Sequence, residues 1–181
     1  MKQWLKMNDK LYIGIDVGAK GFISTQINGH WQHFSIADND LYQLSEIMRE
    51  MRLKYENIAC VIEDVNAIFG SSAKATFQFG FNKGYLIGLL AANKIPYTLV
   101  NPKVWQREMW ENSDMVISYK TITVNGQQKT RKDVNTKQTS LNCAKRLFPT
   151  MDFRKSERAK KFDDNKVDSI LLCEYGRRKN F

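Results

Sequence analysis

The stretch Leu11-Tyr12-Ile13-Gly14-Ile15-Asp16 is a short apolar run that ends on a carboxylate. A run of this length and composition predicts a buried strand, which breaks at Gly18. Residues 58–62 form a second run, Ile-Ala-Cys-Val-Ile, and Glu63 follows it. Because this run is continuously apolar, we expect a central strand that is covered on both faces. The two strands are predicted to be neighbours, so that both carboxylates emerge at one edge of the sheet.

The segments around these strands complete an α/β architecture. Residues 21–27 and 31–36 read as strands joined by the tight turn Asn28-Gly29-His30, so the chain opens with three antiparallel strands. Residues 95–100 read as a fifth strand. Apolar residues spaced three and four apart predict helices over 41–54, 73–92, 136–148 and 163–178. This order predicts a mixed five-stranded sheet flanked by helices on both faces.

Glycine repeats every four residues along the predicted helix 73–92, at Gly80, Gly84 and Gly88. The three positions fall along one side of the helix. Because glycine adds no side chain, we expect this side either to lie close to the sheet or to admit the backbone of a ligand.

Residues 111–136 are polar, basic and poor in apolar periodicity. Asn125-Gly126 lies between two runs that suit strands, which is a strong signal for a short hairpin. An exposed basic hairpin and a disordered loop are both open at this point. The basic side chains of this segment are candidates for phosphate contacts, against the alternative of a merely solvated loop. They are Lys120, Lys129, Arg131 and Lys132.

The totals favour one domain over residues 1–181, with a partner that is a polyanion. The chain is 43% hydrophobic and 26% charged, as is ordinary for a globular domain, and its net charge is +9. Residues 1–100 hold 10 basic against 9 acidic side chains, whereas residues 101–181 hold 18 against 10. A basic half of this kind indicates nucleic acid as the partner, with a solvated basic surface as the plainer alternative.

Several other classes of protein are disfavoured. No apolar run approaches the ~20 residues that span a bilayer, and the first ten residues lack a secretory signal. The three cysteines are scattered, so we expect them to be reduced and buried, as in a cytosolic protein. His30 and His33 are the only histidines, which argues against structural zinc.

Four carboxylates stand where a metal site would need them. Asp16 and Glu63 end strands, while Asp164 and Asp168 lie at i and i+4 near the start of the last helix, on one side of it. Like charges that meet raise one another's pKa values unless a cation lies between them. Hard oxygen ligands select Mg²⁺ or Mn²⁺, and a pair of such ions ~4 Å apart can hydrolyse phosphodiesters. The plainer alternatives are a turn after Asp16, a surface acid at Glu63 and helix-dipole contacts for the last pair.

Several blocks of the chain resemble RuvC-type Holliday junction resolvases, and most closely the small RuvC-like endonucleases of phages. Together they cover most of residues 11–178 in the same order. The matching blocks are Ile62-Glu63-Asp64-Val65, residues 71–80, Gly84-Tyr85-Leu86-Ile87-Gly88, residues 95–105, Ala144-Lys145-Arg146-Leu147-Phe148-Pro149 and the Asp164…Asp168 helix.

This resemblance implies a ribonuclease H-like fold and hydrolysis of branched DNA with Mg²⁺, for which Mn²⁺ can substitute, at two ions per site. It also implies a homodimer that makes paired nicks. Asp16, Glu63 and Asp168 match the metal-binding acids of the family, and Asp164 matches the fourth. Lys137 matches a lysine that assists catalysis near the scissile phosphate.

The chain departs from the family pattern in three places, one of which is that residues 111–136 are longer than in compact relatives. Asp163 and Asn165 replace the histidine or glycine of many relatives, so either Asp163 or Asp164 can be the fourth ligand. The aromatic that separates bases near the junction in some relatives has no direct match, and Phe69 is the candidate for stacking on an unpaired base. Lys74 and Lys83 are further candidates for DNA contacts.

Three other functions compete with junction cleavage. One is a less selective nuclease that acts on flaps, forks or hybrids, and another is a non-catalytic module that binds branched DNA. The third is a sugar kinase or actin-like ATPase, because Gly14-Ile15-Asp16-Val17-Gly18 also resembles the first phosphate loop of those proteins. Such chains need two of these domains and about twice this length, so we reject this alternative.

Overall fold

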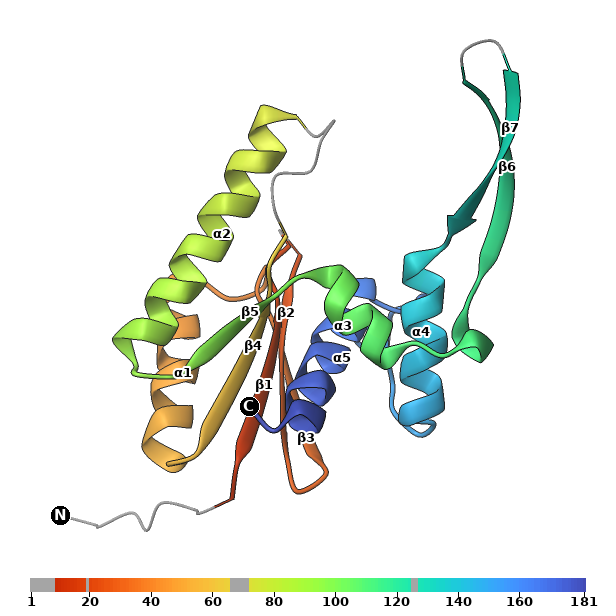
Figure 1. The fold of residues 1–181 in the computed structure, drawn as a ribbon. Coiled ribbons are helices and arrows are strands. Elements are labelled where there is room, and N and C mark those ends of the chain that lie inside the picture. The colour runs from red at the N-terminus through yellow and green to blue at the C-terminus, as the bar shows by residue number, and fades with distance from the viewer. Residues whose placement is uncertain (1–8, 19, 66–71, 125–126) are drawn as a thin grey trace, which may run out of the picture.

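A computed structural model describes residues 9–18, 20–65, 72–124 and 127–181. The main sheet has five strands in the order β3-β2-β1-β4-β5 (Figure 1). β2 is antiparallel to β1 and β3, whereas β4 is parallel to β1 and β5. The predicted mixed five-stranded sheet is therefore confirmed. The strands are β1 (Leu11–Asp16), β2 (Phe22–Ile27), β3 (His30–Ser35), β4 (Ile58–Glu63) and β5 (Tyr97–Val100).

Helices cover both faces of this sheet. α1 and α2 pack on one face, and α5 lies across the other, where α3 and α4 pack against it. The helices are α1 (Leu41–Lys54), α2 (Ala73–Ala92), α3 (Pro102–Met109), α4 (Thr136–Leu147) and α5 (Asp164–Lys179). The apolar spacing does not predict α3, because this short helix buries only Trp105 and Met109. The signal that marks α3 is Asn101, whose side chain caps the helix just before its first residue, a proline.

Alternation along β1 decides which side chains face α5. Ile13 and Ile15 join the core beneath α1 and α2, so Gly14 and Asp16 face the opposite layer. A Cβ on Gly14 would lie 2.2 Å from the carbonyl oxygen of Ser169 on α5. Only glycine therefore lets α5 lie this close to the sheet, and that closeness places α5 beside Asp16.

The glycine row of α2 lies on the side of the helix away from the sheet. A Cβ at Gly80, Gly84 or Gly88 would meet no atom of the described residues within 4 Å, whereas Leu86 and Leu90 face the core. The expectation that this row lets α2 approach the sheet is wrong. It fails because spacing shows only that the glycines share a side, and the buried leucines decide which side packs.

β6 (Ile117–Val124) and β7 (Gln127–Val134) form a separate two-stranded antiparallel sheet, here called the arm. The arm projects away from the rest of the molecule (Figure 1). It thus has the form of the basic hairpin, one of the two alternatives for this segment. The expected turn at Asn125-Gly126 lies outside the described residues.

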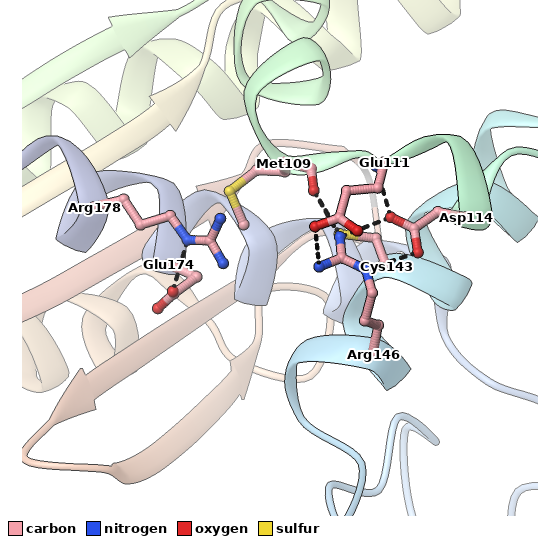
Figure 2. A network of polar contacts seen from close by, with 7 residues as sticks. All are labelled: Met109, Glu111, Asp114, Cys143, Arg146, Glu174 and Arg178. Atoms are coloured by element: carbon pink, nitrogen blue, oxygen red, sulfur yellow. Dashed lines mark hydrogen bonds and ion pairs between the residues drawn. The ribbon is translucent and has the colours of Figure 1, made fainter.

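Arg146 on α4 fastens the chain just before the arm (Figure 2). Its guanidinium donates to both carboxylate oxygens of Asp114, at 3.0 and 2.8 Å, and to the carbonyl oxygen of Met109 at 3.0 Å. Asp114 belongs to the short 3-10 helix η1 (Asn112–Asp114) and is only 2% exposed. Burial raises the pKa of Asp114, but the bond and charge of Arg146 and the backbone amide of Glu111 together outweigh it, so this pKa lies below its ordinary value. The base of the arm is thereby tied to α4.

The sequence also makes predictions about the state of the cysteines and the length of the apolar helices. Cys60, Cys143 and Cys173 are free and buried, as expected. Among the helices of the described ranges, none is long and apolar enough to cross a bilayer.

Replacing Arg146 by methionine should destabilise the fold by about 3 kcal/mol, because a buried carboxylate loses its countercharge. Urea unfolding measures this change. Glu111 pairs with the same guanidinium at 2.9 Å but is largely exposed. The control E111Q should therefore cost less than about 1 kcal/mol. Equal losses for the two variants would contradict the central role of the buried pair.

Candidate metal and nuclease site

Asp16 and Glu63 emerge side by side at the carboxyl ends of two central strands. β1 and β4 are parallel, and Ile15 lies opposite Ile62, so the next residue on each strand is one of these acids. Asp16 is 8% exposed, and its carboxylate accepts a hydrogen bond of 3.2 Å from the amide of Gly18. The predicted neighbouring position of the two strands is confirmed.

The start of α5 brings two further carboxylates to the same place. Asp164 is the first residue of α5, and Asp168 follows one turn later on the same side. Burial and the charge of Glu63 raise the pKa of Asp16 to about 7, and Asp164 adds to this effect. Burial and the charge of Asp16 likewise raise the pKa of Asp168. Asp16, Glu63 and Asp164 therefore lie close enough to Asp168 to oppose its ionisation.

Asp168 is almost completely enclosed. Ser140 on α4 gives its carboxyl group a hydrogen bond, which lowers its pKa against the larger effect of burial. The Oδ1 atom of Asp168 is buried and has no hydrogen-bond partner among the residues that the structure describes. A buried carboxylate oxygen without a donor is costly in a folded protein and marks a place for a missing cation or water.

Trp105 holds Glu63 and was not expected to do so. Its indole Nε1–H donates to Glu63 Oε1 at 2.9 Å, while the ring is fully buried and lies edge-on to Trp110. Burial raises the pKa of Glu63, and the bond from Trp105 lowers it in part. Spacing alone does not reveal this contact, because it joins α3 to β4 across 42 residues.

Asp163 and Asp164 are the two candidates for the fourth metal ligand, and their contacts differ. Oδ1 of Asp163 accepts from the amides of Asn165 and Lys166 at 3.0 and 3.2 Å and caps α5. Asp164 instead forms an ion pair with Lys137 at the start of α4. The bond to Asp164 raises the pKa of Lys137, so the ammonium stays charged. These contacts favour Asp164 over Asp163 as a ligand.

The donor set fits a hard divalent cation. Among the described residues, no three His, Cys, Asp or Glu side chains converge closely enough to hold a metal as they stand. The charges of Glu63 and Asp164 nevertheless raise the pKa of Asp16, and the oxygen of Asp168 that has no partner among the described residues suits a cation. Asp164 is turned to Lys137. Carboxylate oxygens of this kind suit Mg²⁺ or Mn²⁺.

The predicted DNA-contact residues are distributed over three places. Lys74 is exposed in the first turn of α2. Lys83 forms an ion pair with Asp64, next to Glu63, and is therefore not a free surface cation. Phe69 lies outside the described residues. The other four lie on the arm, where Lys120 pairs with Asp133. They are Lys120, Lys129, Arg131 and Lys132.

Comparison with known proteins shows a likeness at the level of structure. No family model matches the sequence, and no curated protein matches it. The solved structure of T. thermophilus RuvC in complex with a Holliday junction substrate matches with a TM-score of 0.54 at 8% identity. A second structure, of Thermus thermophilus RuvC, matches with a TM-score of 0.51 at 10% identity. Each match covers 94% of this chain and 96% of the other.

The chain has the RuvC fold. The likeness extends over nearly the whole chain, and the α/β order agrees with the expected ribonuclease H-like fold. At 8–10% identity it establishes the architecture and leaves the activity to be argued from the site.

Replacing Asp16 by asparagine should stabilise the metal-free protein, and the gain should depend on pH. In the folded chain the pKa of Asp16 is about 7 against an ordinary 3.8, so folding opposes ionisation of this group. The gain should therefore grow from about pH 4 to about pH 7 and then level off, at up to about 4 kcal/mol. Urea unfolding in EDTA over this pH range measures it. A gain that did not change with pH would contradict the raised pKa.

Proposed function

We propose that this protein is a Mg²⁺-dependent, structure-selective endonuclease that nicks four-way junctions and related branched DNA. The observation that carries the proposal is a group of four carboxylates at the ends of β1 and β4 and the start of α5 in a RuvC fold. Within this group Asp16, Glu63 and Asp164 raise the pKa of Asp168, and Glu63 and Asp164 raise that of Asp16. Such a group opposes its own ionisation without a cation, so it is suited to holding one. The net charge of +9 and the basic arm suit a phosphate backbone.

Each residue of the site has a defined role in this proposal. Asp16, Glu63, Asp164 and Asp168 would hold the metal, and Trp105 keeps Glu63 in place through its indole N–H. At this site a bound divalent cation would supply an acidified water and a countercharge for the departing 3′ oxygen. Lys137 holds a positive charge beside Asp164, where it can contact the phosphate that is cut.

Substituting Asp16 tests the site directly. In Mg²⁺, D16N and D164N should each lower the cleavage rate of a four-way junction by at least about 100-fold. This loss is at least as large as that expected for replacing a residue that only supports a metal ligand. Junction binding should persist, because neutralising an acid does not weaken phosphate contacts. Gel assays of cleavage and binding measure both properties.

The matched control is D163N, since asparagine also caps helices and should leave cleavage near the level of the parent. A panel of forks, flaps, hybrids and linear duplex, with and without Mg²⁺, completes the test. Equal cutting of every substrate would indicate the less selective nuclease. Binding without any cutting would indicate the non-catalytic module, and an active D16N would refute the metal assignment.

We further propose a homodimer that pairs through the bare side of α2. Phe77 and Phe81 are 74% and 51% exposed, and they fall with Gly84 and Gly88 within about 60° around the helix. A bare apolar stripe of this kind marks an interaction surface, and the glycines let a second backbone approach. A second copy of this stripe is the self-complementary partner that a two-fold dimer requires.

The variant F77S/F81S should convert the dimer to monomer in sedimentation velocity at micromolar concentration, because it removes the apolar contact. L53S is the control, since Leu53 is 56% exposed on α1, away from the stripe. A parent that sediments as a monomer, or a double variant that still dimerises, would exclude this interface.

A further inference from the structure

The two faces of the arm differ in charge. Paired residues of β6 and β7 share a face, and Lys120 lies opposite Arg131 with Lys129 two residues along β7. These three residues are here called the cationic face. The opposite face carries Tyr119 beside Lys132, and otherwise mainly uncharged polar side chains. Asp133, opposite Ser118, is the one acid on the cationic face, so this face carries a net charge of +2 against +1 on the other.

This positive charge is unfavourable for the arm by itself. Like charges directly opposite one another destabilise a pair of strands, and a lone two-stranded sheet has no core to offset them. Lys120 has one ion pair, with Asp133. Within the described residues, neither Lys129 nor Arg131 forms an ion pair. A polyanion laid on this face would supply the missing countercharge.

The base of the arm is fixed beside the carboxylate site. The backbone N–H of Asn135, between β7 and α4, donates a hydrogen bond of 2.9 Å to the carbonyl oxygen of Val116. The backbone N–H of Val116 in turn donates to the hydroxyl of Thr139 on α4 at 3.1 Å. α4 also carries Lys137, which pairs with Asp164. DNA that reached the carboxylates would therefore lie next to the base of the arm.

The spacing of the cations fits a regular duplex. Residues i and i+2 of a strand lie about 6.6 Å apart, so Lys129 and Arg131 are separated by about two base-pair steps of 3.4 Å. The eight residues of each strand extend over roughly 25 Å. This length is sufficient to follow most of one turn of DNA, which rises about 34 Å.

We infer that the arm grips a regular duplex next to the cut, with its cationic face on the phosphates, and does not contact the point where strands cross. The inference rests on the proposed function, because the duplex would be one arm of the branched substrate. The grip supplies affinity that is independent of sequence, since phosphate contacts position a protein without reading bases.

The test compares binding of a linear duplex and a four-way junction with arms of the same sequence, by fluorescence anisotropy in EDTA over a range of salt. K129Q/R131Q should weaken binding to both DNAs by the same factor, about tenfold, and make the salt dependence shallower by about 2 in log–log slope. K54Q/K94Q removes the same charge near the amino ends of β4 and β5, opposite the carboxylates. This control should change binding by less than about twofold, as should K132Q on the opposite face.

Three results would overturn the inference. A loss confined to the junction would place the arm at the crossing point, and equal losses for K129Q/R131Q and K54Q/K94Q would indicate general attraction only. If K129Q/R131Q bound both DNAs as well as the parent does, the cationic face would not contact DNA, and another partner, such as an acidic protein, would be indicated. Because binding is measured without metal, a parent that binds but never cuts would refute the nuclease and leave the arm result standing.

Discussion

The close approach of α5 to β1 is the contact on which the site depends. Gly14 permits it, since any side chain there would overlap the backbone of Ser169. The approach buries Asp168 and sets it beside Asp16, so both carboxyl groups are poorly hydrated, and the charge of Asp16 raises the pKa of Asp168. Burying the two carboxylates costs free energy. One hydrogen bond from Gly18 to Asp16 and one from Ser140 to Asp168 offset only part of this cost.

Contacts around the carboxylates join them to the rest of the fold. Trp105 links α3 to Glu63, and Lys137 links α4 to Asp164, so two helices from the second half of the chain hold acids of the site. α4 also holds the arm, through Thr139 and Arg146. One helix thus fixes the position of a basic surface relative to the acidic site, which is the arrangement that a protein acting on a polyanion requires.

The predictable features of this chain are those that local patterns encode. Alternating and continuous apolar runs predict the five strands, and their order predicts the mixed sheet, because each strand must bury its apolar faces. The ends of β1 and β4 predict that Asp16 and Glu63 meet, since parallel neighbours end at the same edge. Helix α3 escapes such reasoning, because eight residues with two buried side chains leave too short a pattern.

By itself, the sequence determines the elements, the charge of the second half and the placement of acids at strand ends, since these depend on neighbours along the chain. The tertiary structure decides which residues those acids meet. It directs Asp163 to the cap of α5 and Asp164 to Lys137, gives Glu63 its bond from Trp105, and turns the glycines of α2 away from the sheet. These outcomes depend on packing between segments distant in the chain, and no local pattern records which faces of those segments touch.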